Sequence, residues 1–80
     1  MKANNRNVNR AIKKATGFDV YLFKAEGCVS FHSDDEYSSD ILSAMKSRTV
    51  YVNSIDQLSV EQWVAEFKWL LEQLPFEVQQ

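Results

Sequence analysis

The segment from Leu58 to Leu74 constrains the fold most, because it carries both a start signal for a helix and a continuous apolar face. Ser59 and Gln62 have the N-cap and N3 spacing of a capping box. Leu58 and Trp63 flank them at the spacing of a hydrophobic staple. Two independent signals therefore predict that a helix begins at Ser59.

The same segment has one apolar face that we expect to be buried. Its apolar residues recur at three- and four-residue spacing, which is the pattern of a helix with one face in a core. They are Val60, Trp63, Val64, Phe67, Leu70, Leu71 and Leu74. Pro75 ends the pattern because proline cannot continue a helix. We predict a helix over residues 59–74 and a short tail over 75–80.

A second amphipathic helix is predicted near the start of the chain, over residues 4–16. Asn4 or Asn5 provides an N-cap, and Gly17 stands where a left-handed residue ends a helix. The apolar stripe consists of Val8, Ala11, Ile12 and Ala15. The other side carries Arg6, Arg10, Lys13 and Lys14. One face therefore suits a core and the other suits solvent or an anionic partner.

Three segments between the helices have the alternating pattern of strands. The first two, residues 19–24 and 28–32, are separated by a turn that contains Gly27 and form a predicted hairpin. The third covers residues 49–55. A short helix or an ordered loop lies between the second and third strands, with Ile41, Leu42 and Met45 directed inward.

This order predicts one α+β domain with two layers. A three-stranded antiparallel sheet forms one layer, and both long helices cover its valine-rich face. Eighty residues with 45% hydrophobic and 25% charged side chains suit a single small globule. The single cysteine, the polar N-terminus and the lack of a long apolar run predict a cytoplasmic protein that contacts no membrane.

The only histidine and the only cysteine lie close to a group of acids, which raises the question of a metal or catalytic site. The acids are Asp34, Asp35, Glu36 and Asp40. Their spacing does not fit a calcium loop, and Cys28 and His32 lie too far apart on one strand to act as nucleophile and base. We expect a solvated acidic loop, no cofactor and no enzymatic activity.

Two surfaces stand out as candidate contact sites. The outward face of the predicted sheet carries Tyr21, Phe23, Cys28, His32 and Tyr51, and open aromatic faces bind proteins or stack on bases. The alternative is that the middle segment, residues 38–48, covers this face.

Trp69 is the second candidate. It lies about 160° around the helix from Phe67, on the polar side, where tryptophan can anchor an interface. Burial of Trp69 under the C-terminal tail is the alternative interpretation.

Charge is distributed unevenly along the chain. Five of the nine basic residues lie within residues 1–14, which contain no acid. Residues 15–80 carry the other four basic residues and all eleven acidic residues. The element order matches that of double-stranded-RNA-binding domains, but the last helix starts with an acidic rather than a lysine-rich turn. The remaining candidates for a nucleic-acid contact are Arg6, Arg10, Lys13 and Lys14. Four basic side chains predict weak, salt-sensitive binding.

The stretches "AIKKATGFDVYLFKAEGCVSFHSDDE" and "SRTVYVNSIDQLSVEQWVAEF" resemble a group of small bacterial proteins from prophages and other mobile elements. The resemblance covers about residues 11–69. Residues 27–31 depart from it, because the group often has a more aromatic strand there. The group has no assigned activity, so the resemblance implies only a context, that of a cytoplasmic accessory protein of phage type.

We therefore expect a non-catalytic interaction module that binds a host or phage protein, which the sequence does not identify, or a second copy of itself. Its acidic loop also allows mimicry of phosphate, which would inhibit a host protein that binds nucleic acid. Weak nucleic-acid binding through the basic first helix is the alternative function.

Overall fold

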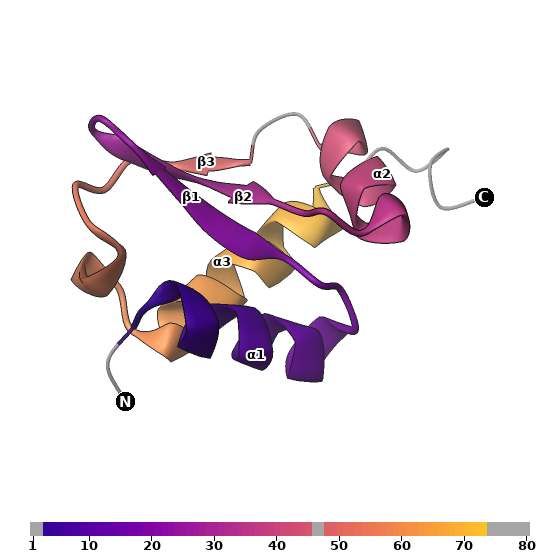
Figure 1. The fold of residues 1–80 in the computed structure, drawn as a ribbon, viewed down its shortest axis with the longest axis horizontal. Helices are drawn as coiled ribbons and strands as arrows, with labels where there is room; N and C mark the ends of the chain where they lie inside the picture. Colours follow the sequence, from indigo (N-terminus) through magenta and orange to yellow (C-terminus); the bar gives the residue numbers. More distant parts are fainter. Residues whose placement is uncertain (1–2, 46–47, 74–80) are drawn as a thin grey trace.

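The computed structural model describes residues 3–45 and 48–73 as three helices and a three-stranded antiparallel sheet (Figure 1). In chain order the elements are α1 (Asn5–Thr16), β1 (Tyr21–Ala25), β2 (Cys28–His32), α2 (Glu36–Ala44), β3 (Thr49–Val50), the 3-10 helix η1 (Ile55–Gln57) and α3 (Val60–Glu72). The strands lie in the order β1-β2-β3. Helix α1 packs on α3 and β1, and the two helices α1 and α3 lie on the same side of the sheet. The predicted α+β fold is confirmed.

Local capping explains where α1 and α3 begin and where α1 ends. The Asn4 side chain accepts a hydrogen bond from the Asn7 amide, and Gly17 closes α1 at φ 84°. Ser59 and Gln62 form the predicted capping box of α3. Helix α3 ends at Glu72, two residues before the predicted end, and residues 74–80 lie outside the described part of the chain.

The hairpin matches its prediction closely at β2 and less closely at β1. Tyr21 pairs with His32 and Ala25 with Cys28 across the two strands, and Gly27 turns the chain at φ 75°. Strand β1 begins two residues later than predicted because side chains occupy the preceding backbone. Asn9 donates to the Val20 carbonyl at 2.7 Å, and Ser33 donates to the Asp19 carbonyl.

The prediction of a strand over residues 49–55 was wrong beyond Val50. The Gln57 side-chain oxygen accepts hydrogen bonds from the backbone amides of Asn53 and Ser54, which withdraws both amides from strand pairing. Ser54 and Gln57 thereby form a second capping box, which starts η1. Strand β3 pairs only with Val29 and Ser30 of β2, and the Val52 amide donates back to the Val50 carbonyl at 3.0 Å, so the chain leaves the sheet after Val50.

The prediction of a solvated acidic loop was also wrong in its conformation. Asp35 is the N-cap of α2, and its carboxylate accepts a hydrogen bond from the Ser38 amide at 2.9 Å. Glu36 begins the helix and Asp40 lies within it. Leu42 is buried as predicted, whereas Ile41 and Met45 are only half-buried.

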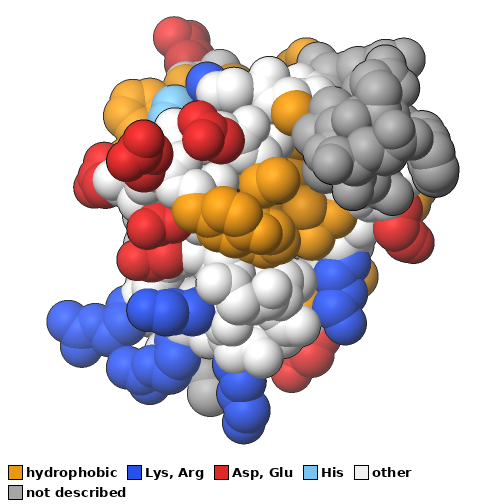
Figure 2. All heavy atoms as spheres, turned by 90° about the vertical axis from the view of Figure 1, so that its right-hand side faces the viewer, with side chains coloured by type: hydrophobic (Ala, Val, Ile, Leu, Met, Phe, Trp, Pro, Cys, Tyr) orange, Lys and Arg blue, Asp and Glu red, His pale blue; other side chains and the backbone are white. Residues whose placement is uncertain are grey.

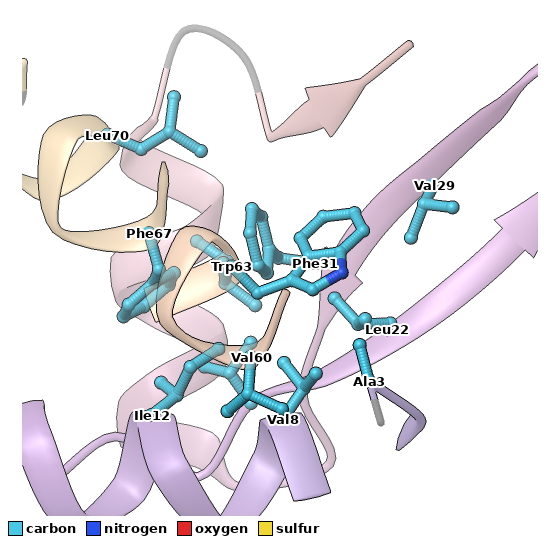
Figure 3. Packing of buried hydrophobic residues seen from close by; sticks show 12 residues of the cluster. Ala3, Val8, Ile12, Leu22, Val29, Phe31, Val60, Trp63, Phe67 and Leu70 are labelled. Carbon is cyan, nitrogen blue, oxygen red and sulfur yellow. The ribbon is translucent and has the colours of Figure 1, made fainter. Parts of the chain in front are cut away.

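The core lies between the sheet and the two long helices (Figure 3). Phe31 of β2 packs against Trp63 and Phe67 of α3, with ring centroids 5.8 and 5.3 Å apart. The Trp63 indole donates to the Ile55 carbonyl at 2.7 Å, so its polar atom is satisfied. The radius of gyration, 11.9 Å, is close to the roughly 12 Å expected of a compact 80-residue domain.

Candidate interaction surface

The side of the sheet that faces away from the helices is the main candidate site. Because side chains alternate along a strand, burial of Leu22, Val29 and Phe31 directs their neighbours outward. We call the resulting surface the outer sheet face. It consists of Tyr21, Phe23, Ala25, Cys28, Ser30, His32 and Thr49.

Three rings gather on this face. The His32 ring lies between Tyr21 and Phe23, with centroid distances of 6.1 and 5.1 Å. We call these three residues the aromatic cluster. Tyr21 and His32 are half-buried, whereas Phe23 is 54% exposed. The strand register produces the cluster, because Tyr21 pairs directly with His32 and Phe23 lies diagonal to it.

The rest of the outer sheet face is small and polar. The hydroxyls of Ser30 and Thr49 lie 3.1 Å apart and link β2 to β3. The Cys28 thiol is half-buried. Tyr51 is 83% exposed but follows the end of β3, and it makes no ring contact within the described part of the chain. Of the predicted aromatic residues, the structure therefore brings together Tyr21, Phe23 and His32, and leaves Tyr51 apart.

Helix α2 does not cover the outer sheet face. It lies beyond one end of the sheet (Figure 1), and its Leu42 packs into the core. The exposure of Phe23 is consistent with this placement. The alternative interpretation was that residues 38–48 cover this face; within that segment, residues 46 and 47 lie outside the part of the chain that the structure describes.

The acidic residues divide into two roles. Asp34 adjoins the aromatic cluster, because the Tyr21 hydroxyl donates to its carboxylate at 3.5 Å. Asp35 instead caps α2, and its hydrogen bonds with Ser38 hold the pKa of its carboxyl below the usual value, with a smaller contribution from nearby Lys13. Glu36 and Asp40 are exposed on α2. Only Asp34 thus belongs to the candidate site.

Trp69 forms a separate candidate surface. It is 56% exposed and, together with Ala65 and Glu66, lines a shallow hollow on α3. Since Phe67 on the same helix points into the core, Trp69 points away from the sheet. The tail that was the alternative cover for Trp69 lies outside the described residues, so the interface interpretation stays a prediction.

The predicted basic residues all lie exposed on α1. Arg6, Arg10, Lys13 and Lys14 fall within about 100° of one another around the helix. Figure 2 shows basic side chains gathered on the α1 side of the molecule, with acidic and hydrophobic side chains next to them. A shallow groove between α1 and α3 adjoins this face, with Ala11, Ala15, Val60 and Val64 in its lining and Lys14 and Glu61 beside them.

Sequence reasoning missed several residues that organise these surfaces. Tyr37 is 65% exposed on α2 and stacks on Phe18 at a centroid distance of 5.4 Å. Asn5 and Asn9 bind the backbone of β1 and of the residues before it. The cluster of asparagines on the flank of the apolar stripe was the available signal, but which backbone groups they bind depends on the tertiary fold.

No family model, curated protein or solved structure matches the chain. The resemblance to prophage proteins therefore stays a prediction. No helix in residues 3–45 and 48–73 is long and apolar enough to cross a membrane. In the same ranges, no group of three or more histidine, cysteine, aspartate or glutamate residues is placed to hold a metal ion.

Proposed function

We propose that the protein is a non-catalytic interaction module that binds another protein through its outer sheet face. The observation that carries this proposal is the position of Phe23, which is 54% exposed although it belongs to a ring cluster. A small domain gains little from a large apolar ring in water, whereas aromatic rings are enriched in protein interfaces.

The composition of the face supports a protein partner. It combines rings that provide contact area with hydroxyls that hydrogen-bond, as Ser30 and Thr49 do to each other. Trp69 provides a second contact surface on the opposite side of the domain. Two separate aromatic surfaces would let the module bind a partner on one side and a second molecule, or a second copy of itself, on the other.

The biological context is part of the proposal. The resemblance to small prophage proteins suggests a phage-type accessory protein that works in the cytoplasm on a host or phage protein. Inhibition of a host protein fits a module of this size, because occupying a partner's surface requires no catalytic group and no cofactor.

The experiment is a pull-down from bacterial lysate with the tagged full chain, with and without nuclease, read by mass spectrometry. Phe23→Ser and Trp69→Ser test the two aromatic surfaces. Tyr37→Ser is the matched control, because Tyr37 is as exposed as either residue but lies on α2. We expect one protein that survives nuclease, is lost with Phe23→Ser and is kept with Tyr37→Ser. Retention by a folded Phe23→Ser variant would refute the proposal.

Weak nucleic-acid binding is a second candidate, favoured by the exposure of four basic residues on one face of α1. Replacing Arg6, Arg10, Lys13 and Lys14 together by glutamine tests it. Under this alternative, co-purifying nucleic acid disappears in the variant and at high salt. Under the main proposal, the variant captures the same protein as the wild type.

A further inference from the structure

The outer sheet face carries no basic side chain at its outward-facing strand positions and has a carboxylate at each end. Within the three described strands, the outward-facing positions include no lysine or arginine. Asp34 lies at one end of the face, within hydrogen-bond reach of the Tyr21 hydroxyl. Glu26 is exposed in the turn at the other end. A partner that covers this face therefore meets aromatic rings between two carboxylates, those of Asp34 and Glu26.

Such a surface suits a cation. The faces of aromatic rings attract ammonium and guanidinium groups, and the attraction grows when a carboxylate is close by. Phe23 offers exposed ring surface, and Tyr21 lies two residues further back on the same strand, about 7 Å away. An extended arginine side chain spans this spacing.

We infer that the outer sheet face binds an arginine side chain of the partner protein. The aliphatic part of the arginine packs on Phe23, and its guanidinium lies over the aromatic cluster and pairs with the carboxylate of Asp34. This inference rests on the proposed function and specifies the chemistry of the partner. Arginine fits better than lysine because its planar, weakly hydrated group both stacks on rings and pairs with carboxylates.

The charge of the whole domain agrees with this choice. Outside residues 1–14 the chain carries eleven acids and four bases. The basic residues of α1 lie on the helical layer, on the other side of the sheet from the outer sheet face. A basic segment of a partner is therefore attracted to the face. A nucleic-acid backbone would meet no lysine or arginine at the outward-facing strand positions of this face.

The test is an NMR titration of the full-length protein with the peptide Ac-Gly-Arg-Gly-NH2. The matched probe replaces arginine by citrulline, which has nearly the same shape but no charge, because a carbonyl oxygen stands in place of one NH2 group of the guanidinium. We expect the ring signals of Tyr21, Phe23 and His32 to shift with the arginine peptide and to shift much less with the citrulline peptide. Equal shifts with both peptides, or unmoved ring signals, would overturn the inference.

Two variants localise the effect. Asp34→Asn should weaken binding of the arginine peptide about two- to fivefold, the usual size of an exposed ion pair. Asp40→Asn makes the same change in net charge on α2, away from the face, and should leave the affinity unchanged. Equal weakening by both variants would mean that overall charge, rather than this site, attracts the peptide.

The outcomes separate this inference from the proposed function. If Phe23→Ser loses the captured protein but the arginine peptide moves no ring signal, the face is an interaction surface and the arginine assignment is wrong. If Phe23→Ser keeps the captured protein, the proposed function is wrong. The inference that an arginine of the partner binds this face is then refuted as well.

Discussion

The side-chain amide of Asn5 pairs with both backbone groups of Leu22. Its nitrogen donates to the Leu22 carbonyl at 2.6 Å, and its oxygen accepts from the Leu22 amide at 2.7 Å. Strand β1 lies at the edge of the sheet, where backbone groups would otherwise lack a partner. The Asn5 side chain therefore makes the two hydrogen bonds that a neighbouring strand would make at this position, and it joins α1 to the sheet.

Replacing Asn5 by alanine should destabilise the domain by about 1 to 3 kcal/mol, because two partly buried backbone groups lose their partner. The exposed edge should also make the variant more prone to aggregate. Urea unfolding and light scattering measure the two effects. Arg6→Ala, one residue along on the exposed side of α1, is the control and should change stability by less than about 0.5 kcal/mol.

Phe23 and Phe31 provide a direct test of which face of the sheet is buried. Phe31 is fully buried, so Phe31→Ala should cost about 3 to 5 kcal/mol. Phe23→Ser should cost much less, about 1 kcal/mol, because the ring is half exposed and loses only its contact with His32 and its preference for a strand. Urea unfolding of the two variants measures both values. Similar losses for both would show that Phe23 belongs to the core.

The two tryptophans should report opposite environments. Trp63 is fully buried, whereas Trp69 is 56% exposed. In Trp69→Phe the remaining indole should emit at short wavelength and resist quenching by acrylamide. In Trp63→Phe the remaining indole should emit at longer wavelength and be quenched readily. Equal quenching in the two variants, with both folded by circular dichroism, would contradict the assigned exposure of Trp69.

Asp35 should make the stability of the domain depend on acid. Its hydrogen bonds with Ser38 lower the pKa of its carboxyl below the ordinary 3.8, so the folded state favours the charged form. The resulting stabilisation is complete above pH 3.8 and is lost as the pH falls through the lowered value. Asp35→Asn keeps a capping oxygen without the charge.

The variant should therefore lose less stability than the wild type on acidification. Urea unfolding of both proteins, from about pH 7 to about pH 3, measures the difference. If the two stability curves run parallel below about pH 4, the Asp35 carboxylate has no part in the acid response.

The elements that could be predicted are those whose signals are local. The capping box at Ser59 and Gln62 and the glycine after α1 act within a few residues, and the predicted starts and ends agree with the structure there. The alternation in β2 correctly separated Val29 and Phe31 from His32. The outer sheet face was found in this way.

The elements that could not be predicted depend on competition between residues. Alternation continues past Val50, but the Gln57 side chain takes the amides that a longer strand would use. The acidic run looked like a loop because its role as a cap depends on a helix that has little amphipathic pattern. The ring contacts of His32 with Tyr21 and Phe23 depend on strand register, which alternation alone does not specify.

The most direct test of the account is photo-crosslinking in cells, with p-benzoylphenylalanine placed at Phe23 or, for comparison, at Arg10 on the exposed side of α1. If the outer sheet face is the interaction surface, the probe at position 23 forms an adduct with one protein, and the probe at position 10 does not. An adduct at position 10 and none at position 23 would contradict the account and transfer the contact to α1.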